Sequence, residues 1–233
     1  MSLIELNQVS RIYDETIVPI HAVDNVDLKI EKGEFTAIVG PSGSGKTTML
    51  NLIGGLDQPT SGKIIIDGTD ISTYKPDALI NFRLHHIGFV FQAYNLIPVF
   101  TAKENVEFIM LLQNIPKSER EKKAIEFLQA VGLSDRINST PAELSGGQQQ
   151  RVAVARALAS TPSFVLADEP TANLDSVSAE SLLNLMKDLN HIHSMTFVFS
   201  THDQRVIKRA HRIVTLQDGK IKSDERNLNH TKK

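Results

Sequence analysis

The stretch GPSGSGKT, at residues 40–47, contains the residue types that bind nucleotide phosphates. It lies between the apolar runs FTAIV and TMLNLI, which predicts a strand, a loop and a helix in succession. Backbone N–H groups of such a loop surround a phosphate, while Lys46 reaches the β- and γ-phosphates and the Thr47 hydroxyl ligates Mg²⁺. The alternative is a glycine-rich turn that only links strand to helix. We predict that the nucleotide-binding residues here are Gly40, Pro41, Ser42, Gly43, Ser44, Gly45, Lys46, Thr47 and Thr48.

The stretch FVLADEP, at residues 164–170, is a second chemical signal, because four apolar residues lead directly into two carboxylates. A buried strand ending in Asp168 and Glu169 delivers both acids to the carboxyl edge of a parallel sheet, where open α/β sheets bind ligands. Asp168 is expected to hold Mg²⁺ through water, and Glu169 to orient and deprotonate a water that attacks the γ-phosphate. Taken alone, the pair fits a solvated turn equally well, but the phosphate loop favours the chemical role.

Three more side chains are candidates on weaker grounds. His202 follows the apolar run FVFST and can donate to a γ-phosphate, although an ordinary loop histidine would look the same. Gln92 follows IGFVF, and its amide could contact Mg²⁺ and the attacking water or simply end a strand. Tyr13 could stack on an adenine ring or pack half-buried within a strand.

The stretch AELSGGQQQRVAVARA, at residues 142–157, indicates a second anion-binding turn. Ser145, Gly146 and Gly147 precede a predicted helix that starts at Gln148, and the first N–H groups of a helix are unpaired and positively polarised. Because the chain already has a phosphate loop, the presence of a second anion-binding turn requires a separate explanation.

The remaining sequence predicts the elements that position these residues. Residues up to about 70 are rich in strands, residues 75–158 are mostly helical, and the last third alternates strands and helices, as in an α/β domain. One helix is expected to open with a capping box at Ser118 and Glu121 and to stop at Gly132. A hairpin with an Asp-Gly turn is expected at residues 212–221, followed by a frayed polar tail from residue 223.

Composition excludes several classes of function. The 233 residues include no cysteine, which excludes thiol redox chemistry and cysteine-ligated metals. A net charge of −2 gives no reason to expect nucleic acid as a partner. The N-terminal stretch is not apolar like a signal peptide, and the longest charge-free stretch, residues 84–102, contains polar residues, glycine and proline. We therefore expect no direct membrane insertion, so a membrane role requires a partner.

The motifs, in this order, resemble the ATP-binding subunit of ATP-binding cassette transporters. The resemblance covers nearly the whole chain and rests on the phosphate loop, Gln92, the signature LSGGQ, the strand FVLADE, the segment NLD and His202. It implies an α/β fold with a P-loop NTPase core of mixed, mainly parallel sheet, an antiparallel β subdomain and an inserted α-helical subdomain. Within one nucleotide-binding domain, residues 1–82 and 159–222 would form the core and β subdomain, 83–158 the helical subdomain and 223–233 the tail.

The resemblance also accounts for the second anion-binding turn. In the family, two cassettes face each other head to tail, and the signature of one covers the nucleotide on the phosphate loop of the other. This implies a homodimer that hydrolyses ATP with Mg²⁺. The catalytic side chains implied are Lys46, Gln92, Glu169 and His202, and the metal-site residues are Thr47, Gln92 and Asp168. The residues facing the partner's ATP would be Leu144, Ser145, Gly146, Gly147 and Gln148, beside a D-loop of Asn173, Leu174 and Asp175.

Longer stretches are similar to the lipoprotein-releasing and macrolide-export cassettes and to cell-division cassettes. These imply a separate transmembrane permease, with this chain peripheral on the cytoplasmic face of the membrane and driving export, lipoprotein release or mechanotransmission. Phe100 and Leu96 are candidate permease contacts, with core packing as the alternative. Other functions left open are a cell-division-type actuator without cargo and, less favoured, a soluble cassette ATPase in DNA repair or translation.

Overall fold

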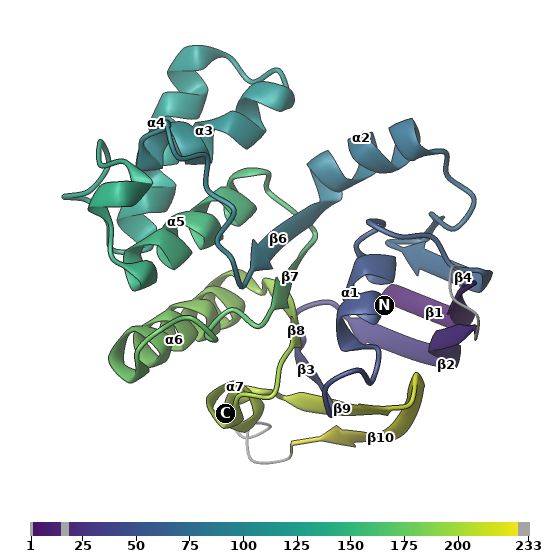
Figure 1. Ribbon diagram of the computed structural model, residues 1–233. Coiled ribbons are helices and arrows are strands. Elements are labelled where there is room, and N and C mark those ends of the chain that lie inside the picture. The colour runs from purple at the N-terminus through teal and green to yellow at the C-terminus, as the bar shows by residue number, and fades with distance from the viewer. Residues whose placement is uncertain (1, 15–18, 228–233) are drawn as a thin grey trace.

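The computed structural model describes residues 2–14 and 19–227, and its larger sheet leads into most of the predicted site residues. That sheet has the strand order β10-β9-β3-β8-β7-β6 (Figure 1). Neighbours from β9 to β6 pair in parallel and β10 pairs antiparallel to β9, which confirms a mixed, mainly parallel sheet. The bounds are β3 Phe35–Val39, β6 Ile87–Phe91, β7 Phe164–Asp168, β8 Thr196–Ser200, β9 Arg212–Gln217 and β10 Lys220–Arg226.

A smaller antiparallel sheet forms the predicted β subdomain, with the order β2-β1-β4-β5. Its strands are β1 Ser2–Tyr13, β2 Ile20–Glu31, β4 Ser61–Ile66 and β5 Thr69–Asp70. Along β2 buried and exposed residues largely alternate, as expected when one face of a sheet meets a core and the other meets solvent. Helix α1, Lys46–Ile53, shares one buried cluster with this sheet and with strands of the larger sheet.

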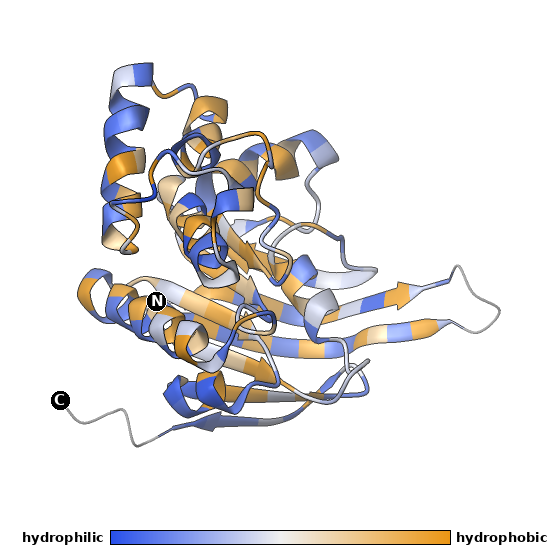
Figure 2. Cartoon of the chain, turned by 60° about the vertical axis from the view of Figure 1, so that its left-hand side comes forward, coloured by the Kyte–Doolittle hydropathy of each residue, from blue (hydrophilic) through white to orange (hydrophobic). Residues whose placement is uncertain are grey.

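The helices cover the larger sheet and build a group beside it. They are α2 Pro76–His86, α3 Ala102–Leu112, α4 Lys117–Ala130, α5 Gly146–Ala159, α6 Ser176–His193 and α7 Gln204–Arg209, with a 3₁₀ turn at Pro141–Glu143. Figure 1 shows α3, α4 and α5 together, adjoining β6 and β7. A second buried cluster joins these three helices to α6 and the sheet. In Figure 2 hydrophobic residues are concentrated on the central strands, while the outer helices carry both hydrophobic and hydrophilic residues.

The predicted capping box at Ser118 and Glu121 is wrong. The N-cap of helix α4 is Pro116, two residues before the predicted cap, and its fixed φ of −56° already suits the entry into a helix. Glu121 instead pairs with Lys103 and Lys117. The predicted stop at Gly132 is confirmed, because its φ of +74° is left-handed and ends the helix.

The prediction of a frayed tail is also wrong for residues 223–226, because β10 continues to Arg226. Arg212 on β9 donates to both carboxylate oxygens of Asp224, at 2.7 and 2.6 Å, and this cross-strand pair extends the hairpin. The predicted Asp-Gly turn is confirmed, with φ of 51° at Asp218 and 75° at Gly219. Residues 228–233 lie outside the described ranges. Strand β6 falls within the predicted helical range 83–158 but belongs to the larger sheet.

We predict that Phe197→Ala lowers the free energy of unfolding by about 3–5 kcal/mol, because a buried aromatic ring is replaced by a cavity. Phe197 is fully buried, with ring centroids 5.8 Å from those of Phe35 and Phe199. Denaturant unfolding measures the change. Ile192→Ala is the control, because Ile192 is 73% exposed and its loss should cost less than about 0.5 kcal/mol. Equal losses in the two variants would contradict this account of the core.

Candidate active site

The predicted phosphate loop connects β3 to α1, which confirms the strand–loop–helix arrangement. Lys46 turns back over the loop, and its Nζ donates to the carbonyl oxygens of Gly40 at 2.9 Å and Pro41 at 3.0 Å. An ammonium group with three donors can exchange such carbonyl partners for phosphate oxygens. The lysine is therefore already held within reach of the site where a phosphate would enter.

Two positions in the loop require glycine, because the backbone of another strand lies too close to leave room for a Cβ. A Cβ at Gly40 would lie 2.1 Å from the Leu216 carbonyl oxygen, and one at Gly45 would lie 2.0 Å from the Ala22 carbonyl oxygen. Gly45 also has a φ of +98°, which side chains rarely adopt. The loop is thus pressed against β9 and β2, a constraint that the motif alone does not reveal.

Parallel pairing brings the other candidates to the same edge as the loop. In register, Phe91 pairs with Asp168, Asp168 with Ser200, and Ser200 with Ile38. The Thr47 hydroxyl lies 3.3 and 3.4 Å from the two carboxylate oxygens of Asp168. A hydroxyl and a carboxylate are hard oxygen ligands, so this pair fits the Mg²⁺ that the sequence predicts.

Glu169 and His202 form a hydrogen-bonded pair just beyond this row. Glu169 Oε1 lies 2.7 Å from His202 Nδ1, and Glu169 Oε2 accepts from the Thr201 hydroxyl at 3.1 Å. The Glu169 side chain is 17% exposed and that of His202 is 76% exposed, so the carboxylate is sheltered behind the imidazole. Glu169 has a left-handed φ of 45°, and its N–H donates to the Ser200 carbonyl. Such strain is typical of functional positions.

Asp203 joins the loops that follow β7 and β8. Its carboxylate accepts from the Thr171 hydroxyl at 2.6 Å and from Arg205 Nη2 at 2.7 Å, and it caps α7. Burial favours the neutral acid, but hydrogen bonds from Arg205 and Thr171 outweigh it and lower the pKa of Asp203 to about 2. The hydrogen bond from Thr171 therefore ties the segment after Glu169 to the segment that carries His202.

The predicted D-loop contacts the segment around Gln92. Asn173 Nδ2 donates to the Gln92 carbonyl oxygen at 3.0 Å, and the Gln92 side chain is exposed at the end of β6. Asp175 caps α6 by accepting from the N–H groups of Ser178 and Val177, and the Ser178 side chain together with these N–H groups lowers the pKa of Asp175. Leu174 packs against the core.

The predicted signature turn starts α5 two residues earlier than expected, at Gly146. The Ser145 hydroxyl accepts from the Gln148 N–H, and the Gln148 side chain accepts from the Ser145 N–H, which makes a capping box. Gly146 and Gly147 occupy the first turn, where N–H groups have no intrahelical partner. Leu144 is 6% exposed and belongs to the core cluster, so a contact between its side chain and nucleotide is not supported.

Tyr13 is held at the end of β1 by protein groups. Its hydroxyl donates to Asp57 at 2.7 Å, and the Arg11 guanidinium lies 4.4 Å from the ring centroid. These contacts fit the packing alternative as well as an adenine platform, so stacking stays a prediction.

Two polar residues near the site were missed from sequence. Thr201 is fully buried, and its position directly before His202 was the sequence signal that could have identified it. Gln150 on α5 is also fully buried. A sequence signal that could have identified it is its position as a polar residue on the helix face that carries the apolar residues Ala153 and Val154.

Comparison with known proteins identifies the class of the chain. Residues 23–172 match the ABC transporter family. The chain therefore belongs to that family, and it is an ATP-binding and ATP-hydrolysing cassette. Among the described helices, none has the length and apolar composition needed to cross a bilayer.

Similar proteins come from several organisms. The macrolide export ATP-binding/permease protein MacB of Hyphomonas neptunium is 49% identical over 97% of this chain, which spans only 35% of that protein. YvrO of Bacillus subtilis, an uncharacterised ABC transporter ATP-binding protein, is 46% identical, with 96% of this chain and 97% of YvrO covered. A dimeric structure of the cassette MJ0796, in a post-hydrolysis state with ADP and Pi, matches with a TM-score of 0.88, at 45% identity and covering 96% and 98% of the two chains.

We predict that Asp203→Asn lowers the melting temperature by several degrees at pH 7, because the charged partner of Arg205 is lost. A carboxylate whose folded pKa is depressed stabilises the fold above its ordinary pKa of about 3.9, and this contribution disappears as pH falls towards about 2. Thermal melts from pH 7 to pH 2 should therefore show the difference between wild type and variant shrinking below pH 4. A difference that stays constant down to pH 2 would contradict the assignment.

Proposed function

We propose that this chain is the ATPase subunit of a membrane complex that performs export, lipoprotein release or mechanotransmission, with two copies binding two Mg-ATP head to tail. The observation that carries the proposal is the sheltered Glu169–His202 pair, 2.7 Å apart, beside the Thr47–Asp168 pair and the phosphate loop. A base, a donor, a metal site and an anion loop at one sheet edge are the groups that phosphoryl transfer to water requires.

The residues divide the reaction among them. Lys46 exchanges its loop carbonyls for β- and γ-phosphate oxygens. Thr47, Gln92 and, through water, Asp168 would hold Mg²⁺, which would supply positive charge against the phosphates. Glu169 takes a proton from the water whose oxygen bonds to the γ-phosphorus, as the bond to the β–γ bridging oxygen breaks and ADP leaves.

His202 has two tasks in this proposal. Its Nδ1 holds the Glu169 carboxylate, and with both ring nitrogens protonated its Nε2 can donate to the γ-phosphate. Because the imidazole is largely exposed, it can meet a nucleotide without rearrangement of the core.

The second half of each site would come from another copy of the chain. In this arrangement Ser145, Gly146 and Gly147 direct the N-terminus of α5 at the γ-phosphate held by the partner's phosphate loop. The dimeric structure of the MJ0796 cassette, at 45% identity, supports the association of two copies. ATP would then hold the dimer together, and hydrolysis would release it.

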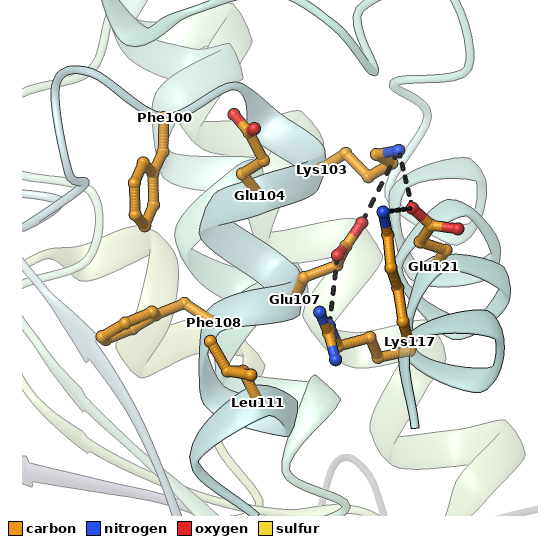
Figure 3. A pocket seen from close by; sticks show the side chains of 9 residues that line it. Phe100, Lys103, Glu104, Glu107, Phe108, Leu111, Lys117 and Glu121 are labelled. Atoms are coloured by element: carbon orange, nitrogen blue, oxygen red, sulfur yellow. Dashed lines mark ion pairs between the residues drawn. The ribbon is translucent and has the colours of Figure 1, made fainter. Parts of the chain in front are cut away.

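The membrane partner would be a permease that receives this chain on the cytoplasmic face. MacB, a 49% identical relative, is named as an ATP-binding/permease protein, and this chain spans 35% of it. A hollow along α3 and α4 offers a docking place: Phe100, Phe108 and Leu111 lie on one side, and ion pairs of Lys103, Glu107 and Glu121 lie on the other (Figure 3). Leu96 packs against the core, so Phe100 is the better of the two candidate contacts.

We predict that Glu169→Gln lowers kcat about a hundredfold or more, because the amide cannot accept the proton of water. ATP binding groups are unchanged, so the variant should accumulate as an ATP-bound dimer. Light scattering after gel filtration, with ATP and Mg²⁺, measures the mass, and ADP serves as the control. A variant that stays monomeric at high concentration with ATP would count against the head-to-tail proposal.

We predict that Ser145→Arg lowers kcat about a hundredfold, because the long side chain removes the capping hydroxyl and blocks the approach of the partner's phosphate to the N–H groups of the turn. The affinity of the single chain for ATP should stay within about twofold, since the turn belongs to the other copy's site. Binding of a fluorescent ATP analogue to dilute chain, beside steady-state turnover, separates the two quantities. A large loss of affinity in the monomer would mean that the signature acts on its own chain's nucleotide.

A further inference from the structure

Gln150 contacts the backbone beside two of the candidate catalytic residues at once. Its side chain is fully buried on α5, and Nε2 donates to the Pro170 carbonyl at 2.9 Å and to the Phe91 carbonyl at 3.3 Å. Pro170 directly follows Glu169, and Phe91 directly precedes Gln92. One amide group thus ties the signature helix to both segments that would act on the chain's own ATP.

Packing alone does not explain a glutamine at this position. Its Oε1 is buried and makes no hydrogen bond within the described residues. An unpaired buried acceptor destabilises a fold, whereas a methionine of similar length would fill the same space without it. The two bonds made by Nε2 are therefore the feature that a glutamine adds.

The backbone at Glu169 is placed so that a displacement of Pro170 would change the orientation of the Glu169 side chain. Glu169 has a left-handed φ of 45°, and its N–H is fixed by the Ser200 carbonyl at 2.9 Å. With the N-terminal side held by β8, the Gln150 bond holds the other side. A shift of α5 would therefore turn the peptide between these anchors and redirect the carboxylate.

Helix α5 also binds the residues that follow Gln92. Arg156 Nη2 donates to the Tyr94 carbonyl at 2.8 Å, and Nη1 donates to the Asn95 carbonyl. Tyr94 and Asn95 both have positive φ, at 54° and 52°, so the segment is held in an unfavourable conformation. Gln92 therefore lies between two attachments to the same helix.

We propose that Gln150 is a positioning residue that couples the two ATP sites of the dimer. The N-terminus of α5 meets the partner's nucleotide, and five residues on from Ser145 the Gln150 amide sets the placement of Gln92 and Glu169 at the chain's own nucleotide. Occupancy of one site thereby changes the rate at the other. This inference rests on the head-to-tail arrangement of the proposed function.

The test compares Gln150→Met with Gln113→Met in the full chain. Gln113 is a matched control, because its Nε2 likewise donates to two backbone carbonyls, Leu84 at 2.8 Å and Ser160 at 3.1 Å, away from the site. For Gln150→Met we expect kcat to fall about tenfold or more, with KM for ATP within about twofold. The Hill coefficient of ATP hydrolysis should fall towards one. The Gln113→Met variant should have a lower melting temperature but the same kcat and Hill coefficient as the wild type.

The inference would be overturned by a wild-type chain without cooperativity, by a Gln150→Met variant with wild-type kcat and Hill coefficient, or by equal kinetic losses in both variants. A loss of kcat with an unchanged Hill coefficient would also reject the coupling. Should Gln150→Met not fold, Gln150→Asn, which keeps the amide but shortens its reach, is subject to the same criteria. A failure of the proposed function is distinguished by a separate experiment, because it would appear as an absence of ATP-dependent dimers of the Glu169→Gln variant.

Discussion

The hydrogen-bonded register of four parallel strands is the constraint on which the site depends. Phe91, Asp168, Ser200 and Ile38 lie in one row across β6, β7, β8 and β3. Each strand ends at or next to this row, so the residues that follow them emerge at one edge. A slip of one residue in any strand would move its side chains to the opposite face and separate the groups. The continuous apolar burial of β7 and β8 fixes that register.

One chain supplies two surfaces for a nucleotide, and they are placed apart. The phosphate loop, Asp168, Glu169 and His202 lie at the edge of the larger sheet, while Ser145, Gly146 and Gly147 start α5. In a head-to-tail dimer the nucleotide would become part of the interface, so association and turnover would share the same contacts. The bonds from Gln150 and Arg156 give α5 a physical route from one surface to the other within each chain.

Much of this arrangement could be predicted from sequence, because the motifs record local chemistry. The strand–loop–helix around Lys46, the apolar strand ending at Asp168 and the hairpin at Asp218 each depend on neighbours in sequence, and the structure has all three. Helix starts were less predictable: Pro116 replaced the expected cap at Ser118, whereas the capping box at Ser145 was not foreseen. Both choices depend on how the preceding chain enters the helix.

The parts that escaped prediction are those set by tertiary contact. Gly40 and Gly45 are needed because β9 and β2 press on the loop, and Thr171, 32 residues away, adds to the hydrogen bond from Arg205 in lowering the pKa of Asp203. The two partners of Gln150, at the end of β6 and just after β7, lie together because these strands pair. The extension of β10 to Arg226 likewise depends on Arg212 across the hairpin.

The most direct measurement mixes two inactive chains, Lys46→Ala and Ser145→Arg, and follows ATP hydrolysis. In a head-to-tail dimer the mixed pair has one site with both defects and one site with none, because the intact phosphate loop of one chain meets the intact signature of the other. The head-to-tail arrangement predicts that the mixture hydrolyses ATP at a rate that neither variant shows alone. A mixture as inactive as its components, beside an active wild-type chain and with mixed dimers present, would contradict it.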